Sequence, residues 1–327
     1  MPNVNIWNFT FDTKGMRILI TAIGSMSAEC AINRLKVKGH FVVGCDIYPK
    51  DWHYETTLCD VFFQAPFAIE EDKYVSFLLD VCERQDLSYI IPLTDLEIDV
   101  IGRHRHCFED VGITLCMQSA RVLEIVRNKY TLYKYFEADV YVPSIKTSLL
   151  SQFDQTISFP CIAKPYDGRS SEGVIRNATK EQVMAIRDKE KYIVQEQLDG
   201  DVFTVDVCRC KKSGIVCAVP RQELLRTKNG AGLTIRTITD KHLLDLATYI
   251  GGKLDINGCV NMEFIGQNNT YYLIDINPRF SAGIAFSVLA GYDMINNHMN
   301  CFVGVNIDKQ IEIFEKVMIK KYQEVVN

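Results

Sequence analysis

The sequence predicts two architectures in one chain, a parallel α/β sheet of the doubly wound type followed by a two-lobed α+β region. Short apolar runs alternate with helical patterns over the first third of the chain, as in a parallel sheet. From residue 159 onward, many short β-like runs follow one another closely, which favours antiparallel pairing. With 327 residues, 47% of them hydrophobic, the chain can bury the cores of two or three such units.

The first third contains a regular alternation of predicted strands and helices. Residues 17–22 form an apolar run that predicts a buried strand, and a helical pattern over about 27–38 follows a Gly-Ser turn. A second strand is predicted at 41–46 and a third at 88–92, with helical periodicity at 97–108. Strands joined through helices in this way form a parallel, Rossmann-like sheet.

The middle of the chain changes character. A long amphipathic helical pattern covers 122–138, and we place the domain boundary after residue 117. The second region divides into a small lobe with linker helices, 118–190, and a large lobe, 191–327. Its predicted strands are 160–164, 192–196, 203–210, 215–219, 259–265 and 271–276, and its predicted helices are 180–188 and 241–251. The last stretch, 311–326, is ambiguous, and we favour strands because its apolar residues alternate.

Composition indicates a soluble, cytoplasmic protein. The net charge is −5 and the basic residues are scattered, which argues against nucleic acid as a partner. No segment approaches the roughly 20 apolar residues needed to cross a membrane, and residues 1–15 do not resemble a leader. The twelve cysteines are spread along the chain without a metal-binding spacing, so we expect buried, reduced thiols.

The most informative segment for function is the predicted strand at 271–276 with the residues that follow it. Asp275 and Asn277 lie two residues apart and therefore share one face of the strand, and Arg279 comes next. A turn at Asn268-Asn269 would place Glu263 on an antiparallel neighbour, facing Asp275. Hard oxygen ligands beside a guanidinium fork suit Mg²⁺ together with phosphate.

Two further segments add to this set. Lys164 ends an apolar strand, where an ammonium group is costly unless an anion lies nearby. The loop at 166–174 is rich in glycine and serine, so its N–H and hydroxyl groups could face phosphate oxygens, although a plain hairpin loop explains it equally well. The strand at 192–198 leads into a connector that could offer backbone groups to an adenine edge.

In this order, the segments resemble the ATP-grasp superfamily over nearly the whole chain. The closest likeness is to carbamoyl-phosphate-synthase-like and biotin-carboxylase-like members with a pre-ATP-grasp N-terminal domain. The matching stretches are Asn128-Lys129, 162–165, 168–173, 195–197, 261–263 and 275–279.

The resemblance implies ATP and Mg²⁺ (or Mn²⁺) as cofactors and three groups of site residues. ATP would be bound by Lys129, Lys164, Ser170, Ser171, Gly173, Glu196, Gln197 and Leu198. The metal would be held by Glu263, Asp275 and Asn277. The catalytic side chains would be Lys164, Arg221 and Arg279, with Arg279 stabilising the γ-phosphoryl group during transfer.

Three departures from the family pattern bear on the site. Val202 stands where relatives often carry a glutamate that binds ribose. Asp275 replaces a glutamate, which draws the metal ligand back by one methylene. A Ser-Ala-Gly turn at 281–283 replaces a turn richer in glycine. No charge of the metal and phosphate set is lost.

The first third offers weaker candidates. Gly24 and Asp46 invite a dinucleotide-binding reading, but the G-x-G-x-x-G pattern is missing. Thr94, Asp95 and Glu97 follow the carboxyl end of a strand, where open α/β sheets bind ligands, and could contact an acceptor substrate. A helix N-cap at Thr94 or Asp95 explains these residues equally well.

The expected activity is that of an ADP-forming carboxylate–amine (or carboxylate–thiol) ligase. It would activate a small-molecule carboxylate, such as an amino acid, as an acyl phosphate, and the resemblance also implies a homodimer. Two alternatives stay open: phosphorylation of bicarbonate or carbamate, and a catalytically silent ATP-binding module.

Overall fold

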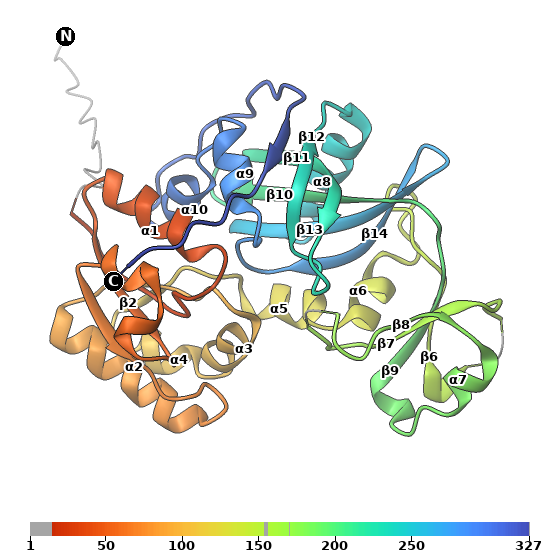
Figure 1. Cartoon of the computed structure of the whole chain (residues 1–327), viewed down its shortest axis with the longest axis horizontal. Helices are drawn as coiled ribbons and strands as arrows, with labels where there is room; N and C mark the ends of the chain where they lie inside the picture. Colours follow the sequence, from red (N-terminus) through yellow and green to blue (C-terminus); the bar gives the residue numbers. More distant parts are fainter. Residues whose placement is uncertain (1–14, 154–155, 170, 327) are drawn as a thin grey trace, which may run out of the picture.

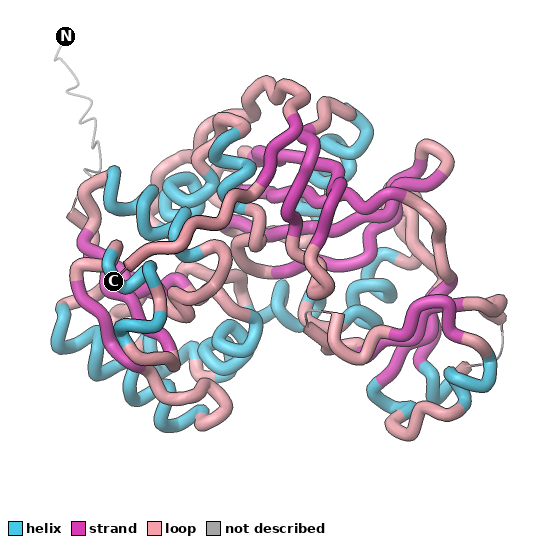
Figure 2. The backbone as a smooth tube through the Cα atoms, viewed as in Figure 1, coloured by secondary structure: helices cyan, strands magenta, loops and turns pink. Residues whose placement is uncertain are grey.

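The computed structural model describes residues 15–153, 156–169 and 171–326, which form three β-sheets with flanking helices. In Figure 1 the N-terminal sheet lies at the left, the large sheet at the upper centre and the small sheet at the lower right. Figure 2 shows the linker helices between the N-terminal and the small sheet. Among the described helices, none combines the length and the apolar composition that a membrane crossing requires.

The N-terminal domain is the parallel sheet that the sequence predicted, with strand order β3-β2-β1-β4-β5. Its strands are β1 (Arg17–Ile20), β2 (Phe41–Asp46), β3 (Val61–Gln64), β4 (Tyr89–Ile91) and β5 (Thr114–Leu115). Its helices are α1 (Ala28–Val37), α2 (Glu71–Gln85), α3 (Asp95–Arg103) and α4 (Arg105–Glu109). The strand order reverses between β1 and β4, so their carboxyl ends frame the crevice where such sheets bind ligands.

Alternation along β1 explains why helices cover both faces of this sheet. Ile18 and Ile20 pack with residues of α1 in one core cluster, whereas Leu19 packs with α2 and α3 in another. Successive side chains of a strand point to opposite faces, so a strand of continuous apolar residues requires cover on both sides.

Two helices link the N-terminal domain to the rest of the chain. The single helical stretch predicted over 122–138 is in fact two helices, α5 (Ala120–Val126) and α6 (Lys129–Phe136). Asn128 ends the continuity, because its side-chain oxygen accepts hydrogen bonds from the backbone N–H groups of residues 130 and 131 and caps α6.

The small sheet is antiparallel, with the order β6-β9-β7-β8. Its strands are β6 (Thr147–Leu149), β7 (Cys161–Pro165), β8 (Ile175–Ala178) and β9 (Tyr192–Glu196), and α7 (Lys180–Met184) is shorter than predicted. The large lobe was expected to begin at residue 191, but β9 pairs with β6 and β7. The chain therefore leaves the small sheet only after Glu196.

The large sheet is antiparallel, with the order β14-β13-β10-β11-β12-β15. Its strands are β10 (Asp201–Arg209), β11 (Val216–Arg226), β12 (Gly232–Thr237), β13 (Gly258–Gln267), β14 (Thr270–Asn277) and β15 (Val317–Ile319). The helices of this part are α8 (Lys241–Lys253), α9 (Ile284–Leu289) and α10 (Met294–Phe302). The strands favoured over 311–326 are confirmed only at β15, because the chain meets the edge of β12 over those three residues alone.

Candidate active site

A hairpin of two adjacent strands carries the predicted metal ligands. Glu263 on β13 pairs directly with Asp275 on β14, and Asn261 pairs with Asn277. The turn residues Asn268 and Asn269 have φ angles of 51° and 59°, which an Asn-Asn turn tolerates well. The hairpin geometry predicted from the sequence is therefore confirmed.

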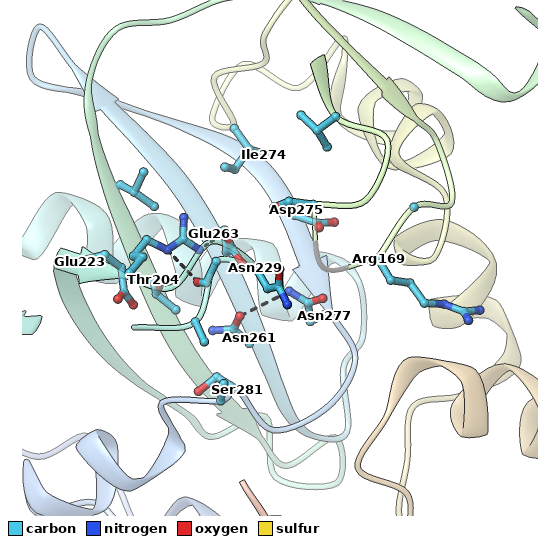
Figure 3. A pocket seen from close by; sticks show the side chains of 18 of the residues that line it. Arg169, Thr204, Glu223, Asn229, Asn261, Glu263, Ile274, Asp275, Asn277 and Ser281 are labelled. Carbon is cyan, nitrogen blue, oxygen red and sulfur yellow. Dashed lines mark hydrogen bonds and ion pairs between the residues drawn. The ribbon is translucent and has the colours of Figure 1, made fainter. Parts of the chain in front are cut away.

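The register of the large sheet extends this hairpin into a row of side chains across four strands, β14, β13, β10 and β11. Thr204 on β10 pairs with Glu263 on one side and with Arg221 on the other, so Asp275, Glu263, Thr204 and Arg221 stand side by side. They line a cavity of about 470 Å³ that also receives side chains from the small sheet and the N-terminal domain. Figure 3 shows the hairpin residues on one wall of this cavity and Arg169 on the opposite side.

Both hairpin acids are paired with cations that come from other elements. Arg226, at the end of β11, lies 2.9 Å from Glu263, and Lys129, at the start of α6, lies 3.3 Å from Asp275. The ammonium group of Lys129 also donates to the carbonyl of Gly168 at 3.0 Å. The two carboxylates keep 22% and 24% of their side-chain surface exposed, so they remain accessible from the cavity.

Lys164 projects into the cavity from β7 of the small sheet. Its ammonium group donates to the side-chain oxygen of Gln195 at 2.9 Å, and Gln195 in turn donates to the hydroxyl of Thr147. Burial, and after it the nearby charge of Lys129, lowers the pKa of Lys164 to about 8. A cation destabilised in this way favours an anionic ligand, which would restore its charge.

Arg221 is almost fully buried and is held on three sides. Its guanidinium donates to Asp206 at 2.6 Å, to Glu223 at 3.1 Å and to the hydroxyl of Ser281 at 3.2 Å. Asp206 also accepts a hydrogen bond from the amide of Asn261, which itself accepts one from Asn277. This network fixes the position of Arg221 relative to the hairpin.

Arg279 connects the hairpin to the N-terminal domain. Its guanidinium donates to Asp95 at 2.9 Å, and Arg127 lies 3.5 Å from the same carboxylate. Burial alone would raise the pKa of Asp95, but Arg279, followed by Arg127, outweighs burial and holds the pKa below its usual value. Asp95 is thus an ionised group at the cavity, contributed from the carboxyl end of β4.

The other two expected acceptor residues lie elsewhere. Glu97 is buried inside the N-terminal domain and accepts hydrogen bonds from the hydroxyl groups of Thr21, Tyr74 and Thr94. Among the described residues that line the cavity, Asp95 is present, whereas Thr94 and Glu97 are not. The carboxylate of Glu97 is fully used by its own domain, which corrects its expected placement beside a substrate.

Some of the expected nucleotide-binding residues line the cavity, and others do not. Ser171 and Glu196 line the cavity, whereas Gly173, Gln197 and Leu198 are absent from its described lining, and Ser170 lies outside the described residues. Gln197 pairs with Asn177 instead. Gly173 shapes the loop, because its φ is 69° and a Cβ there would lie 2.9 Å from Pro165.

Several residues of the cavity were not predicted. They are Arg127, Arg169, Arg176, Glu223, Arg226 and Asn261. The one available signal was the i, i+2 spacing of Arg221 and Glu223, which places both side chains on one face of β11. The partner of Arg226 depends on the order of the strands, which no local pattern encodes.

Comparison with known families agrees with this fold. Residues 188–325 match the family described as "ATP-grasp in the biosynthetic pathway with Ter operon", and residues 18–116 match a PylC-like N-terminal domain. Over residues 188–325 the chain belongs to the ATP-grasp superfamily. Its N-terminal sheet is the pre-ATP-grasp domain, and its small and large sheets enclose the cavity of an ATP-grasp ligase fold.

Individual relatives of this ATP-grasp chain are distant. A D-alanine–D-alanine ligase of Fusobacterium nucleatum is 23% identical over 48% of this chain, and the match spans 62% of that ligase. A carbamoyl phosphate synthase large chain of Vibrio cholerae is 23% identical over 63% of this chain and 16% of its own length. The biotin carboxylase domain of a Hydrogenobacter thermophilus 2-oxoglutarate carboxylase, solved as a dimer with MgADP and bicarbonate, superposes with a TM-score of 0.76. That match is 16% identical and covers 91% of this chain and 72% of the other, which shows a shared fold.

Proposed function

We propose that this chain is an ATP- and Mg²⁺-dependent ligase that activates a carboxylate as an acyl phosphate and transfers the acyl group to an amine. A thiol acceptor would follow the same chemistry. The observation that carries the proposal is the direct pairing of Glu263 with Asp275 in a cavity that Lys129, Lys164 and Arg279 also line. The likeness to a ligase that joins two D-alanines supports an amino acid as one substrate.

The donor set fits Mg²⁺ bound together with a nucleotide. Among the described residues no group of three or more His, Cys, Asp or Glu side chains is placed to hold a metal, so the chain offers two carboxylates and the amide of Asn277. Mg²⁺ is usually bound through one or two carboxylates, with phosphates and waters completing its octahedron. When bound, the ion would neutralise the β- and γ-phosphates.

The side chains of this cavity suit phosphoryl transfer. A carboxylate oxygen of the substrate attacks the γ-phosphorus, the bond to the β,γ-bridging oxygen breaks, and ADP leaves. The amine lone pair then attacks the acyl carbon, phosphate departs, and the amine proton passes to solvent. Lys129 and Lys164 would hold the phosphate oxygens, while Arg279 would stabilise charge on the transferring group. Arg221, fixed by Asp206, would face the acyl group.

The test is an isotope-transfer experiment with purified protein, Mg-ATP and a panel of amino acids. A carboxylate labelled with ¹⁸O should lose one label to the released phosphate, because the acyl phosphate is cleaved at its carbon–oxygen bond. ADP, phosphate and the coupled product should appear in equal amounts. Phosphate released without label would contradict an acyl-phosphate route.

A second candidate is phosphorylation of bicarbonate or carbamate. The likeness to a carbamoyl phosphate synthase chain and to a biotin carboxylase domain favours it. Phosphate release that requires bicarbonate and ignores the amino acids would support this candidate over the amine ligase. Tight ATP binding with no phosphate release from either the amino acids or bicarbonate would instead support a catalytically silent regulatory module.

The dimer of the biotin carboxylase domain also motivates a proposal on assembly. We infer a homodimer for this chain, to be checked by light scattering of the purified protein. A molecular mass near 37.3 kDa, that of one chain, would contradict it.

A further inference from the structure

Glu223 lines the cavity and has one buried carboxylate oxygen without a hydrogen-bond partner among the described residues. Its side chain is 3% exposed, and its Oε1 atom accepts a hydrogen bond from Arg221 at 3.1 Å. Its Oε2 atom is buried and finds no hydrogen-bond partner among the described residues, yet the residue lines the cavity. Buried acceptors in native proteins are nearly always satisfied, so a donor from outside the chain is expected here.

The register of the large sheet places this oxygen at a boundary within the cavity. Phe203 pairs with Gln222, and continuing that register sets Val202 opposite Glu223. Val202 also pairs with Ile265, so an apolar row leads across β13 and β10 to Glu223. The neighbouring row holds Glu263, Thr204 and Arg221. Glu223 therefore stands where the apolar part of the cavity meets its charged part, and Figure 3 shows it beside Thr204.

A nucleotide fits this division in one orientation. Its base suits the apolar part, which Ile162, Val202, Ile265 and Ile274 line, and its phosphates suit the part with Lys129 and Lys164. The ribose joins the two and carries two neighbouring hydroxyl groups. These are hydrogen-bond donors, and a carboxylate oxygen is a strong acceptor for them.

The charges around Glu223 favour a neutral donor over an ammonium group. Asp206 and Glu223 face Arg221 as the shared cation. The ammonium group of Lys320 donates to the carbonyl of Ala282 at 2.6 Å. Burial, and after it the charge of Arg221, lowers the pKa of Lys320, and the charge of Glu223 opposes this shift. Two acids and two cations already balance there, so an additional positive charge gains little.

We propose that Glu223 binds the ribose of ATP, with Oε2 accepting a hydrogen bond from its 2′- or 3′-hydroxyl. The assignment rests on the proposed function only in that ATP occupies this cavity. Gly232 on β12 supports it, because a Cβ at that position would lie 2.2 Å from Oε2. The absence of a side chain at Gly232 leaves room for the carboxylate to stay in this place.

The test is direct binding of ATP, 2′-deoxy-ATP and 3′-deoxy-ATP by calorimetry, with no turnover required. The wild-type protein should bind ATP about tenfold more tightly than at least one deoxy analogue, the usual effect of one hydrogen bond to a charged group. Glu223→Ala should weaken ATP binding about tenfold and bind all three nucleotides equally. Gly232→Ala, which displaces the carboxylate without removing its charge, should give the same loss of discrimination.

Glu223→Gln is the matched control for folding, because its amide keeps the size of the side chain and can still pair with Arg221. It should fold like the wild type. Its discrimination between ATP and the deoxy analogues should lie between that of the wild type and that of Glu223→Ala. The assignment would be overturned if the wild type and Glu223→Ala discriminated equally between ATP and its deoxy analogues. It would also be overturned if Glu223→Ala changed only the binding of the amine substrate. If ATP binds and discriminates but no acyl transfer occurs, the ligase proposal fails while this one stands. If the wild type does not bind ATP, both fail.

Discussion

Acidic residues of the N-terminal domain and of the β13–β14 hairpin were both predicted to lie at the site, but their carboxylates have different hydrogen-bond and ion-pair partners. Glu97 is surrounded by three hydroxyl groups of its own domain. Glu263 and Asp275 are paired with cations from a separate strand and a separate helix, across the cavity. Asp95 is intermediate, since it belongs to the first domain but pairs with Arg279 of the hairpin segment.

The kind of partner therefore distinguishes a carboxylate with a structural role from one that is available to a ligand. An acid whose partners are neutral hydroxyl groups of its own fold has its hydrogen-bonding capacity filled permanently. An acid paired with a cation from another element, and still partly exposed to a cavity, can exchange that partner for a metal ion. Five predictions follow from this comparison, beginning with the largest effect.

Removing a charge at the hairpin should abolish turnover without unfolding the protein. Asp275→Asn or Glu263→Gln should lower phosphate release by about 10³-fold, because either change removes a charged metal ligand at the reacting phosphates. The free energy of unfolding should change by less than about 1 kcal/mol, since both side chains are partly exposed. Turnover assays and urea titrations measure the two effects. A variant that retains wild-type phosphate release would refute the metal assignment.

The opposite pattern is expected at Glu97. Glu97→Ala should lower the free energy of unfolding by about 3 kcal/mol, because the buried hydroxyl groups of Thr21 and Tyr74 and the partly buried one of Thr94 lose their acceptor. Turnover per folded molecule should stay near the wild-type value, since the residue is not part of the described cavity lining. Loss of activity in a well-folded Glu97 variant would contradict this prediction and indicate that Glu97 contributes to the active site.

The pH dependence of the free energy of unfolding gives a second test at Glu97. Burial raises the pKa of Glu97, against the hydrogen bonds from Tyr74, Thr94 and Thr21. Because the folded pKa lies above the unfolded value, the contribution of this carboxyl is complete below the unfolded pKa and falls as pH rises through the folded pKa. Glu97→Gln should remove that part of the slope in urea titrations across acidic pH. An unchanged slope would contradict the assignment.

Lys164 provides a smaller effect that depends on pH. Its pKa of about 8 means that the free protein loses this charge as pH rises above that value. ATP binding should weaken about tenfold between about pH 7 and about pH 9, because binding must then restore the proton. Lys164→Arg, which stays charged, should flatten this profile in calorimetric titrations. A wild-type profile as flat as that of the arginine variant would argue against a phosphate contact.

The smallest effect is expected at the contact between the phosphate loop and the N-terminal domain. Asp99 pairs with Arg127 at 2.8 Å and also with Arg169 of the loop at 168–173. Arg169→Ala should weaken ATP binding by about threefold, because one partly exposed ion pair contributes less than about 1 kcal/mol. Arg121→Ala, an exposed arginine of α5, is the control and should bind ATP like the wild type. Equal binding by both variants would mean that the ion pair between Asp99 and Arg169 does not position the loop.

The parts of the molecule that follow from local patterns could be predicted from the sequence. The parallel sheet, the hairpin turn at Asn268-Asn269 and the shared face of Asp275 and Asn277 depend on spacing and turn chemistry alone. The placement of Lys164 in the same cavity came from the resemblance, since its strand lies in another sheet.

What could not be predicted depends on contacts between distant segments. The pairing of Arg226 with Glu263 requires β10 to lie between their strands, and the assignment of β9 to the small sheet requires its pairing with β6 and β7. The isolation of Glu97 depends on Tyr74, 23 residues earlier in the chain. A spacing pattern that suits a ligand site suits a helix N-cap equally well, and packing decides between them.

The most direct test of the central claim is calorimetric binding of a non-hydrolysable ATP analogue with and without Mg²⁺, in the wild type and in Asp275→Asn. The account predicts that Mg²⁺ tightens binding to the wild type by at least about tenfold and leaves the variant nearly unaffected. Equal enhancement by Mg²⁺ in both proteins would show that the hairpin acids do not hold the metal, and the ligase assignment would lose its basis.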